Sequence, residues 1–377
     1  MKIAFVHDWF NVDGGAEKVA DEILDIYKNE DITVYTLFNS LSKQDCKKIL
    51  KHHPIKTTLL NYIPYRSILY RYLLPLMPFF IRQFYLKDYD LIISSSHAVA
   101  KGFRKAPGIL HVCYCHTPMR YAWDMYEEYA QTHTFGQSFL YKTFVKYIRK
   151  WDLRSSDNVD YYIANSINVQ QRILNNYKRE SVVIYPPVRI EMFNLSEQPR
   201  KDYYLCIGRF VPYKKMDLVL QAFQHMPDKK LILIGEGYGS SSIQDLLKHA
   251  PNIEWLGYVN DEDMIRYIQD AKACIFAAKE DFGILCVEVQ ACGTPVIALR
   301  NGGYLETVVE GETGYLFDDQ TEESIVTAIN RLDENPLTDH QAIRQNALKF
   351  SDERFRNEFQ TYVNKVINEF HSDKKIS

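Results

Sequence analysis

The residues best suited to chemistry lie between Lys279 and Ala298, where the chain reads KEDFGILCVEVQACGTPVIA. Two glutamates in this stretch, Glu280 and Glu288, are separated by seven residues. Ionised carboxylates accept hydrogen bonds, so they suit hydroxyl groups such as those of a sugar. An apolar run before Glu280 predicts a buried strand, and Ile284–Ala291 predicts a helix. The loop between them therefore lies at the carboxyl end of a strand and the amino end of a helix.

This loop suits an anion. Open α/β sheets bind ligands beyond the carboxyl ends of their strands, and free N–H groups at a helix start bind phosphate. The N–H groups would come from Phe282, Gly283, Ile284 and Leu285. The two glutamates would repel a phosphate, so the ligand that satisfies both features carries phosphate and hydroxyl groups together. A nucleotide sugar is such a ligand. The alternative is a surface helix with incidental glutamates.

A basic pair occupies a second loop of the same kind. Tyr203–Ile207 predicts a strand, which runs into Gly208, Arg209 and Lys214 before the next predicted helix. An arginine fork and a lysine ammonium can both reach a diphosphate. Plain surface charge is the alternative, and it suits Lys215 better than the other two cations.

Polar residues also follow predicted strands in the first half of the chain. Gly14 and Gly15, with Glu17 just beyond them, come after a strand over Lys2–His7, and His116 comes after a strand over Leu110–Cys115. Glycines let a ligand approach the backbone closely. The spacing is not the Gly-x-Gly-x-x-Gly of dinucleotide folds. A simple turn and a satisfied strand-end histidine are the alternatives.

Together these residues resemble the signature of the family 4 retaining glycosyltransferases. The glutamates lie within Glu-Asp-Phe-Gly-Ile and before Ala-Cys-Gly-Thr-Pro-Val-Ile, and Arg209 and Lys214 match that family's basic pair, five residues apart. Lys215 departs from the pattern, since many members have glycine there. The resemblance implies the α/β GT-B fold, with two Rossmann-like parallel-sheet domains facing a cleft. It covers nearly the whole chain and is strongest from Tyr203 to Phe317.

The resemblance also implies roles for these residues. Arg209, Lys214 and the helix start would stabilise the diphosphate of a nucleotide-sugar donor, Glu280 would bind sugar hydroxyls, and Glu288 would bind the ribose. His116 would contact the transferred sugar. Further donor contacts are expected from Gly14, Gly15, Gly208 and Val259, with Glu17 nearby, and Trp123 and Asp124 are expected on the acceptor side. We expect no cofactor and no metal, because we find no Asp-x-Asp pair placed beside the diphosphate.

The implied reaction transfers a hexose with retention of configuration. No side chain is an evident covalent nucleophile, so we expect front-face attack. The wording Arg-Phe-Val-Pro-Tyr-Lys is most similar to bacterial mannosyltransferases that build lipid-linked surface polysaccharides such as lipopolysaccharide. It favours GDP-mannose as donor and a lipid-linked saccharide as acceptor. A UDP-sugar-dependent transferase, a nucleotide-sugar epimerase on the same fold and a non-catalytic regulatory binder remain alternatives.

The charge of this 377-residue chain is unevenly spread, although the net charge is only −3. Through Arg189 there are 25 basic and 18 acidic residues, and the remainder has 20 and 30. Residues 51–150 alone have 14 basic residues against 5 acidic ones. A basic half joined to an acidic half indicates that one domain meets something anionic.

Residues 59–87 combine aromatic side chains with Arg66, Arg71, Arg82 and Lys87, and three prolines exclude one long regular helix. Such a segment suits the headgroup region of an anionic membrane. A helical insertion that merely covers the sheet is the alternative. Nucleic acid is not expected, because we recognise no nucleic-acid module in the chain. We therefore expect a cytoplasmic protein, peripheral on the inner face of the plasma membrane.

The seven cysteines lie mostly inside apolar patterns, which is typical of reduced, buried thiols. Cys113 and Cys115 would share one face of a strand, and core packing is favoured over a metal pair because no second pair has metal spacing. The chain runs from Met1 directly into a predicted strand, so we expect no secretory signal. It has no run of eighteen apolar residues, so we expect no membrane-spanning helix.

The proline pair before Val188 predicts a rigid linker between two domains. We expect an acceptor-binding domain over 1–187 and a nucleotide-sugar-binding domain over 188–350. A helix over 351–377, capped by Ser351, would pack back on the first domain. Gly311–Phe317 is predicted as a closing hairpin.

Overall fold

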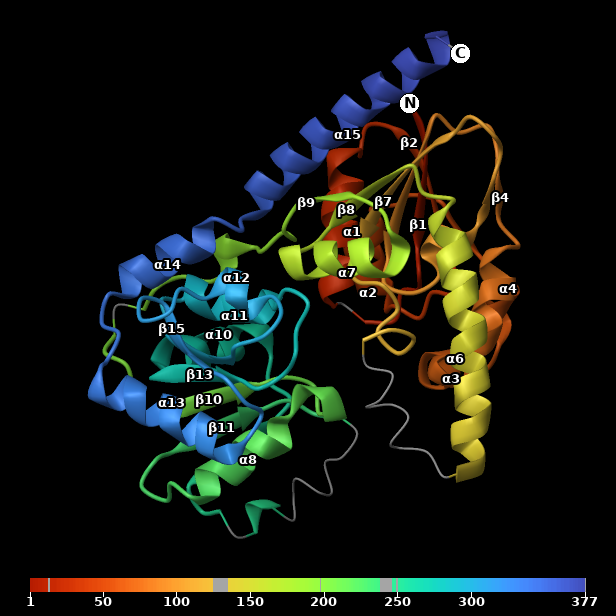
Figure 1. Ribbon diagram of the computed structural model, residues 1–377. Helices are drawn as coiled ribbons and strands as arrows, with labels where there is room; N and C mark the ends of the chain where they lie inside the picture. Colours follow the sequence, from red (N-terminus) through yellow and green to blue (C-terminus); the bar gives the residue numbers. More distant parts are fainter. Residues whose placement is uncertain (13, 125–134, 197, 238–245, 249, 377) are drawn as a thin grey trace. The chain divides into compact units, whose positions relative to one another are not determined.

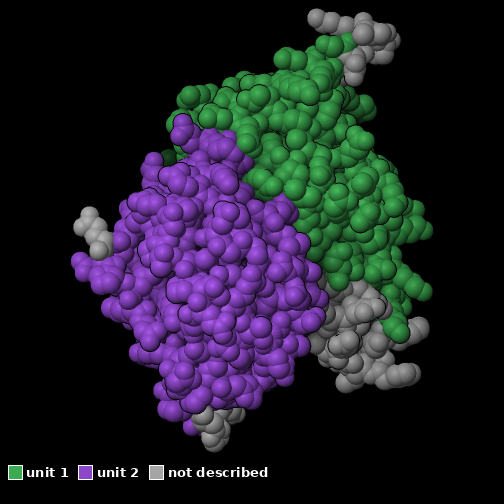
Figure 2. All heavy atoms as spheres, turned by 60° about the vertical axis from the view of Figure 1, so that its left-hand side comes forward, with its two compact units in different colours: residues 1–187, 355–377 green, residues 188–354 purple. Residues whose placement is uncertain are grey.

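The computed structural model describes residues 1–12, 14–124, 135–196, 198–237, 246–248 and 250–376. The chain divides into two compact units (Figure 2). Unit 1 comprises Met1–Pro187 and Phe355–Ser377, and unit 2 comprises Val188–Arg354. Each unit is built on one parallel sheet with helices on both faces (Figure 1). Both units therefore have the α/β architecture that the strand and helix patterns predicted.

The sheet of unit 1 has the strand order β3-β2-β1-β5-β7-β8-β9, with every neighbouring pair parallel. Its strands are β1 (Lys2–His7), β2 (Asp31–Thr36), β3 (Ile55–Thr57), β5 (Leu91–Ser96), β7 (Leu110–Cys115), β8 (Tyr161–Ala164) and β9 (Ser181–Val183). A separate two-stranded sheet pairs β4 (Tyr85–Leu86) with β6 (Arg104–Lys105). In the main sheet His7 lies opposite Ser95, and Ser96 lies opposite Cys115. The carboxyl ends of β1, β5 and β7 therefore form one edge.

Two apolar clusters cover the faces of this sheet. The helices contributing to the first are α1 (Gly15–Ile26), α2 (Lys43–Leu50) and α15 (Asp352–Ile376). Those contributing to the second are α3 (Arg66–Leu73), α4 (Met77–Ile81) and α6 (Phe135–Ser156). Near β8, α7 (Ile167–Tyr177) packs on Cys113 and Cys115, which are buried core residues. Short 3₁₀ turns, η1 (Leu59–Tyr62), η2 (Leu74–Leu76) and η3 (Ala100–Gly102), connect these elements.

Helix α15 returns to unit 1 through one apolar stripe. Phe355, Phe359, Val363 and Val366 are buried in the cluster that contains α1. Their spacing of three and four residues puts them on one face of the helix. The ring of Phe355 lies 5.8 Å from that of Tyr114. Burying such side chains stabilises unit 1 by roughly 1.5–3 kcal/mol each, so the helix is part of its core.

The sheet of unit 2 has the order β12-β11-β10-β13-β14-β15, again all parallel. Its strands are β10 (Tyr204–Ile207), β11 (Leu231–Ile234), β12 (Ile253–Gly257), β13 (Ala273–Phe276), β14 (Val296–Leu299) and β15 (Gly314–Phe317). Helices α8 (Met216–Gln224) and α13 (Glu322–Glu334) lie together on one face (Figure 1). On the other face lie α10 (Asp261–Asp270), α11 (Ile284–Ala291) and α12 (Tyr304–Thr307), and α14 (His340–Leu348) packs on α11.

The predicted hairpin over Gly311–Phe317 is wrong. Gly314–Phe317 forms β15, which pairs parallel with β14 and is buried along its whole length. A parallel neighbour needs a crossover rather than a tight turn, and the segment containing α12 supplies it. Gly311 does make a turn, with a φ of +77° and an N–H donated to the Gly314 carbonyl at 2.9 Å. This turn lies before β15 and does not join two strands that pair with each other.

Candidate functional site

In unit 2, the loops after β10 and β11 are pressed together at the carboxyl edge of the sheet. The Gly208 N–H donates to the Ile234 carbonyl at 3.1 Å, and the Phe210 N–H donates to the Glu236 carbonyl at 2.9 Å. Gly235 has a φ of +132°, and a Cβ there would lie 1.9 Å from the Gly208 carbonyl oxygen. Because only glycine allows this approach, Gly235 holds Gly208 and its basic neighbour in position.

The basic pair lies in the loop after β10. The Arg209 side chain is exposed and makes no hydrogen bond or ion pair with the described residues. Lys214 ends the 3₁₀ turn η5 (Pro212–Lys214), and its Nζ forms an ion pair with Glu280 Oε1. Burial alone would lower the pKa of Lys214, but the Glu280 carboxylate outweighs it and raises that pKa above its ordinary value. Lys214 therefore stays charged while only 26% exposed.

The loop that carries Glu280 rests on the loop after β14. The Gly303 N–H donates to the Glu280 carbonyl at 2.9 Å, and a Cβ on Gly303 would lie 2.2 Å from Phe282 Cα. Gly283 has a φ of +87° and immediately precedes α11. Its left-handed backbone directs the chain from the loop into the helix, whose first N–H groups are those of Ile284 and Leu285. The predicted helix start is therefore present, and its binding of an anion stays a prediction.

The remaining donor-side predictions within unit 2 lie on the same edge. Glu288 is in α11, is 4% exposed, and shares a helix face with Ile284, four residues earlier. Val259 follows β12 and is partly exposed. The N–H of the preceding residue, Tyr258, donates to Glu236 Oε1 at 3.3 Å. The loops after β10, β11, β12 and β13 therefore bring the predicted unit 2 residues to one edge.

In unit 1, His116 lies at the end of β7 and is held by the neighbouring strand. His116 Nε2 lies 2.8 Å from Ser95 Oγ, and His7 Nδ1 lies 3.0 Å from the same oxygen. Burial, and after it the charge of His97, lowers the pKa of His116 to about 3. Burial also lowers the pKa of His7 well below its ordinary value. Both imidazoles are therefore neutral near pH 7.

Sequence analysis missed two residues at this edge, Asp8 and His97. The fully buried Asp8 carboxylate accepts N–H groups from four consecutive residues, at distances of 2.5–2.9 Å, and His97 Nδ1 lies 3.1 Å from its Oδ2. The signal was available, because Asp8 directly follows the predicted strand over Lys2–His7, and His97 directly follows the apolar and serine run that forms β5. The strand-end argument that selected His116 applies equally to them.

The other unit 1 predictions lie at or near the same edge. Gly14 precedes α1 and Gly15 begins it, and Glu17 in the first turn is buried. Asp13, between them and β1, lies outside the described residues. The Trp123 indole N–H donates to Asp152 at 2.8 Å, and Asp124 pairs with Arg172 at 3.1 Å. These two contacts anchor the chain beyond His116.

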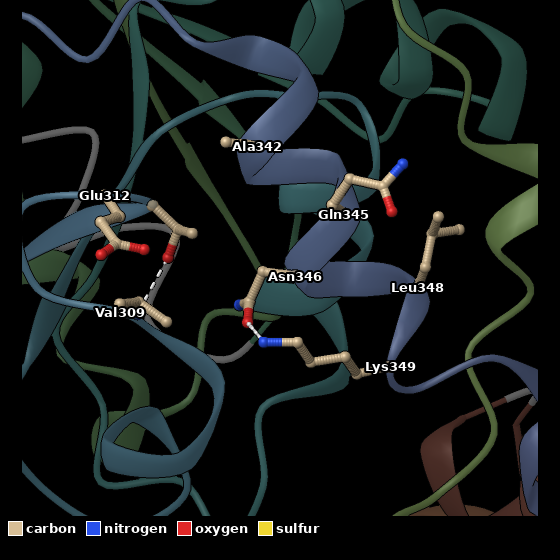
Figure 3. Close-up of a pocket in the computed structure, with 8 residues that line it drawn as sticks. Val309, Glu312, Ala342, Gln345, Asn346, Leu348 and Lys349 are labelled. Carbon is tan, nitrogen blue, oxygen red and sulfur yellow. Dashed lines mark hydrogen bonds between the residues drawn. The ribbon is translucent and has the colours of Figure 1, made fainter.

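A hollow of about 660 Å³ lies elsewhere in unit 2, between α14 and the segment before β15 (Figure 3). Its lining includes Val309, Glu312, Gln345, Asn346 and Lys349, and none of the predicted site residues. Among the described residues no cluster of histidine, cysteine and carboxylate side chains could hold a metal ion. No helix in the described part of the chain is long and apolar enough to cross a bilayer.

Comparison with known proteins gives relatives for both halves of the chain. In curated sequences, a D-inositol 3-phosphate glycosyltransferase of Mycobacterium sp. (strain JLS) is 28% identical over 218 residues, 52% of this chain and 50% of the relative. A GDP-mannose-dependent alpha-(1-6)-phosphatidylinositol monomannoside mannosyltransferase of Mycolicibacterium smegmatis is 29% identical over 163 residues, 39% of this chain and 41% of the relative. The chain therefore spans about half the length, or less, of the curated relatives it matches.

Solved structures share the fold across the whole chain. HepE of Anabaena, in complex with UDP and glucose, has a TM-score of 0.69 at 19% identity, covering 97% of this chain and 99% of that one. Sucrose-phosphate synthase of Thermosynechococcus elongatus has a TM-score of 0.72 at 18% identity, covering 98% and 100%.

Two family models match adjoining parts of the chain. The model "Glycosyltransferase Family 4" matches residues 13–192, and "Glycosyl transferases group 1" matches residues 188–350. The first match lies almost wholly in unit 1 and the second within unit 2. The chain therefore belongs to the family 4 glycosyltransferases and has their two-domain GT-B fold.

Proposed function

We propose that this protein is a retaining glycosyltransferase that moves a hexose, with mannose from GDP-mannose as the leading candidate, to a lipid-linked saccharide. The observation that carries the proposal is the Lys214–Glu280 pair beside the exposed Arg209. Two cations and a carboxylate at one sheet edge match a ligand with both a diphosphate and sugar hydroxyls. The activities named for the curated relatives support the same class of reaction.

The leaving diphosphate needs positive charge as the glycosidic bond breaks. Arg209 and Lys214 supply two cations, and the start of α11 supplies N–H groups and the positive end of a helix dipole. Lys214 pairs with Glu280, so it can contact the diphosphate while Glu280 binds a sugar hydroxyl. These groups supply the charge stabilisation that a metal ion supplies in other transferases, which supports a metal-independent reaction.

Retention of configuration follows from attack on the face that the diphosphate leaves. The bond from the anomeric carbon to the phosphate oxygen breaks, and the bond to the acceptor oxygen forms on the same face. The acceptor's proton passes to the leaving phosphate oxygen. His116, neutral because of its lowered pKa, would exchange a hydrogen bond with the transferred sugar and would not transfer a proton.

The surface around α3 supports an acceptor with an apolar part. Tyr62, Tyr65, Ile68, Tyr72 and Phe79 are each more than half exposed. The opposite side of the same segment is buried, as expected of a helical insertion that covers the sheet. Exposed apolar groups gathered in this way mark an interaction surface. Arg82, Lys87 and Arg104, all exposed, would favour an anionic bilayer.

This surface adjoins the unit 1 edge. The Trp9 ring lies 5.3 Å from the ring of Tyr70 in α3 and 4.6 Å from that of His97. Asn11 Nδ2 also donates to the Ser67 carbonyl at 3.4 Å. A lipid tail on α3 would therefore place an attached saccharide beside His97 and His116.

Thermal unfolding with UDP, GDP, ADP or NAD, in EDTA, tests the donor. A nucleotide that binds only the folded protein stabilises it by about 2.7 kcal/mol at a hundredfold excess over its dissociation constant. We expect GDP to raise the midpoint. A rise with UDP instead would retain the transferase and change the sugar. A response to NAD alone, or to no nucleotide, would contradict the proposal.

Substitution of Lys214 tests the reaction. We expect Lys214→Ala to lower kcat for sugar transfer by roughly 10²–10³, as for loss of one donor to a developing oxyanion. The neighbouring Lys215→Ala is the matched control, and it should transfer at nearly the wild-type rate. Equal activity of the two variants would remove Lys214 from the mechanism.

Sedimentation with vesicles tests the membrane surface. Vesicles of phosphatidylglycerol and phosphatidylcholine should bind the wild type, and Tyr65→Ser combined with Tyr72→Ser should weaken that binding. Binding to phosphatidylcholine alone, unaffected by salt, would contradict the role given to the basic residues.

A further inference from the structure

The Asp8 carboxylate organises the backbone after β5. Its Oδ2 accepts from the N–H groups of His97 and Ala98 at 2.6 and 2.9 Å, and its Oδ1 accepts from Val99 and Ala100 at 2.6 and 2.5 Å. Four hydrogen bonds fill the acceptor sites of this buried carboxylate. Asp8 therefore places His97, the first residue of this turn, with little freedom.

The imidazole of His97 is oriented by the same carboxylate. Its Nδ1 is buried 3.1 Å from Asp8 Oδ2, yet the side chain as a whole is 28% exposed. This contact lacks hydrogen-bond geometry, so the carboxylate lies against the ring without selecting the nitrogen that carries its hydrogen. Trp9 lies edge-on to the ring at 4.6 Å and restricts its rotation. The side chain thus presents one hydrogen-bonding atom, Nε2, to a ligand.

His97 also occupies a position between two parts of the proposed site. Its ring lies 6.3 Å from that of His116, which is proposed to contact the transferred sugar. On its other side, Trp9 separates it from Tyr70 and the exposed apolar surface of α3. An acceptor saccharide that joins a lipid on α3 to the reacting sugar passes this imidazole. The imidazoles of His97 and His116 would face successive sugars.

We propose that His97 is an acceptor-binding residue, whose Nε2 forms a hydrogen bond with a non-reacting hydroxyl of the acceptor saccharide, and that Asp8 is its positioning residue. This inference rests on the proposed function. The attacking hydroxyl still gives its proton to the leaving phosphate, so His97 orients the acceptor and takes no part in bond making.

Two variants of His97 separate hydrogen bonding from packing. His97→Phe keeps the aromatic contact with Trp9 and removes the hydrogen-bonding atom, whereas His97→Gln keeps a hydrogen-bonding amide. With octyl α-D-mannoside as the acceptor, we expect His97→Phe to raise its KM about 10-fold, the upper end for one neutral hydrogen bond. The KM of His97→Gln for the same acceptor should stay within about threefold of the wild-type KM. Stabilisation by the donor nucleotide should be unchanged in both.

An unchanged KM in His97→Phe, or an equal rise in both variants, would overturn the inference. A wild type that transfers no sugar from any nucleotide sugar would instead refute the proposed function. In that case, or if His97→Phe fails to fold, the NMR ring resonances of histidine-labelled wild-type protein test the role of His97. The His97 signal, assigned by its loss in His97→Gln, must shift with octyl α-D-mannoside and not with octanol. No shift would likewise reject the role of His97.

Discussion

The two sheets have similar strand topologies, but different groups form their carboxyl edges. In unit 2, glycines let whole loops approach each other, as where Gly303 meets the Phe282 backbone. The side chains left at that edge include the exposed Arg209 and the Lys214–Glu280 pair. In unit 1, buried side chains hold the edge together instead, with Asp8 and Ser95 orienting the imidazoles.

This difference has a consequence for ligands. Close-packed backbone with the exposed Arg209 and the paired Lys214 suits an anion, whose charge such groups can meet directly. Neutral imidazoles beside an exposed apolar helix suit hydroxyl groups attached to something apolar. This contrast supports the proposal that the donor binds to unit 2 and the acceptor to unit 1.

The largest expected difference between the two units is their loss of stability as the pH falls. Burial lowers the pKa of His7 well below its ordinary value, and that of His111 and of His116 to about 3. Below about pH 6.5 the unfolded chain binds protons that the folded unit cannot, so stability is lost as the pH falls toward 3. Each histidine contributes a loss of up to about 1.4 kcal/mol per pH unit. We expect unit 1 to open before unit 2.

Hydrogen exchange followed by mass spectrometry between pH 7 and pH 4.5 checks this order, because peptides report on each unit separately. In unit 2 the pKa of His340 is also lowered, by partial burial, so a smaller response there is expected. Opening of both units at one pH, with the same slope, would contradict the contrast.

Gly303→Ala should damage the unit 2 edge. Its Cβ would lie 2.2 Å from Phe282 Cα and 2.4 Å from the Phe282 carbonyl oxygen, both backbone atoms that must move. We expect a loss of about 3 kcal/mol in the free energy of unfolding, together with weaker nucleotide binding. Urea denaturation and nucleotide titration measure the two effects.

Gly311→Ala is the matched control for Gly303→Ala. Gly311 has a φ of +77° but open space around it, so only left-handed strain of about 1 kcal/mol is expected. If Gly311→Ala lowered the free energy of unfolding more than Gly303→Ala does, the close approach of the loops would not determine the structure of this edge.

Lys215→Gly should give the smallest effect. Lys215 has a φ of +54°, the left-handed conformation that glycine adopts without strain, and it stands where the resembling family often has glycine. Relief of strain exceeds the added entropy of the unfolded chain by up to about 1 kcal/mol. Thermal unfolding should show a small gain. A loss like that expected for Lys365→Gly, inside α15, would show that the strain is absent.

The sequence predicted elements well where an apolar run ends in glycine or polar residues. The bounds of β1, β7 and α11 match the prediction. The charged α2 was not assigned, because its apolar residues are too few to reveal a period. The hairpin failed because strand pairing is decided by the crossover and not by the local turn signal.

The candidate site shows the same limit. Spacing within one loop predicted Glu280 and Glu288, and the resemblance supplied Lys214. The ion pair between Lys214 and Glu280 joins residues 66 positions apart, and the Asp8–His97 contact joins residues 89 apart. Only the order of the strands shows that such residues meet. A rule that collected every polar strand-end residue would have included Asp8 and His97.

The return of α15 into unit 1 bears on how the chain folds during synthesis. The cluster around Phe5 lacks Phe355, Phe359 and Val363 until all of unit 2 has left the ribosome. At about 5–20 residues per second, unit 2 alone takes roughly 10–30 s to make. During that interval unit 1 exposes an apolar groove on its first sheet face. Nascent chains stalled before Phe355 should therefore bind a chaperone more strongly than the finished chain.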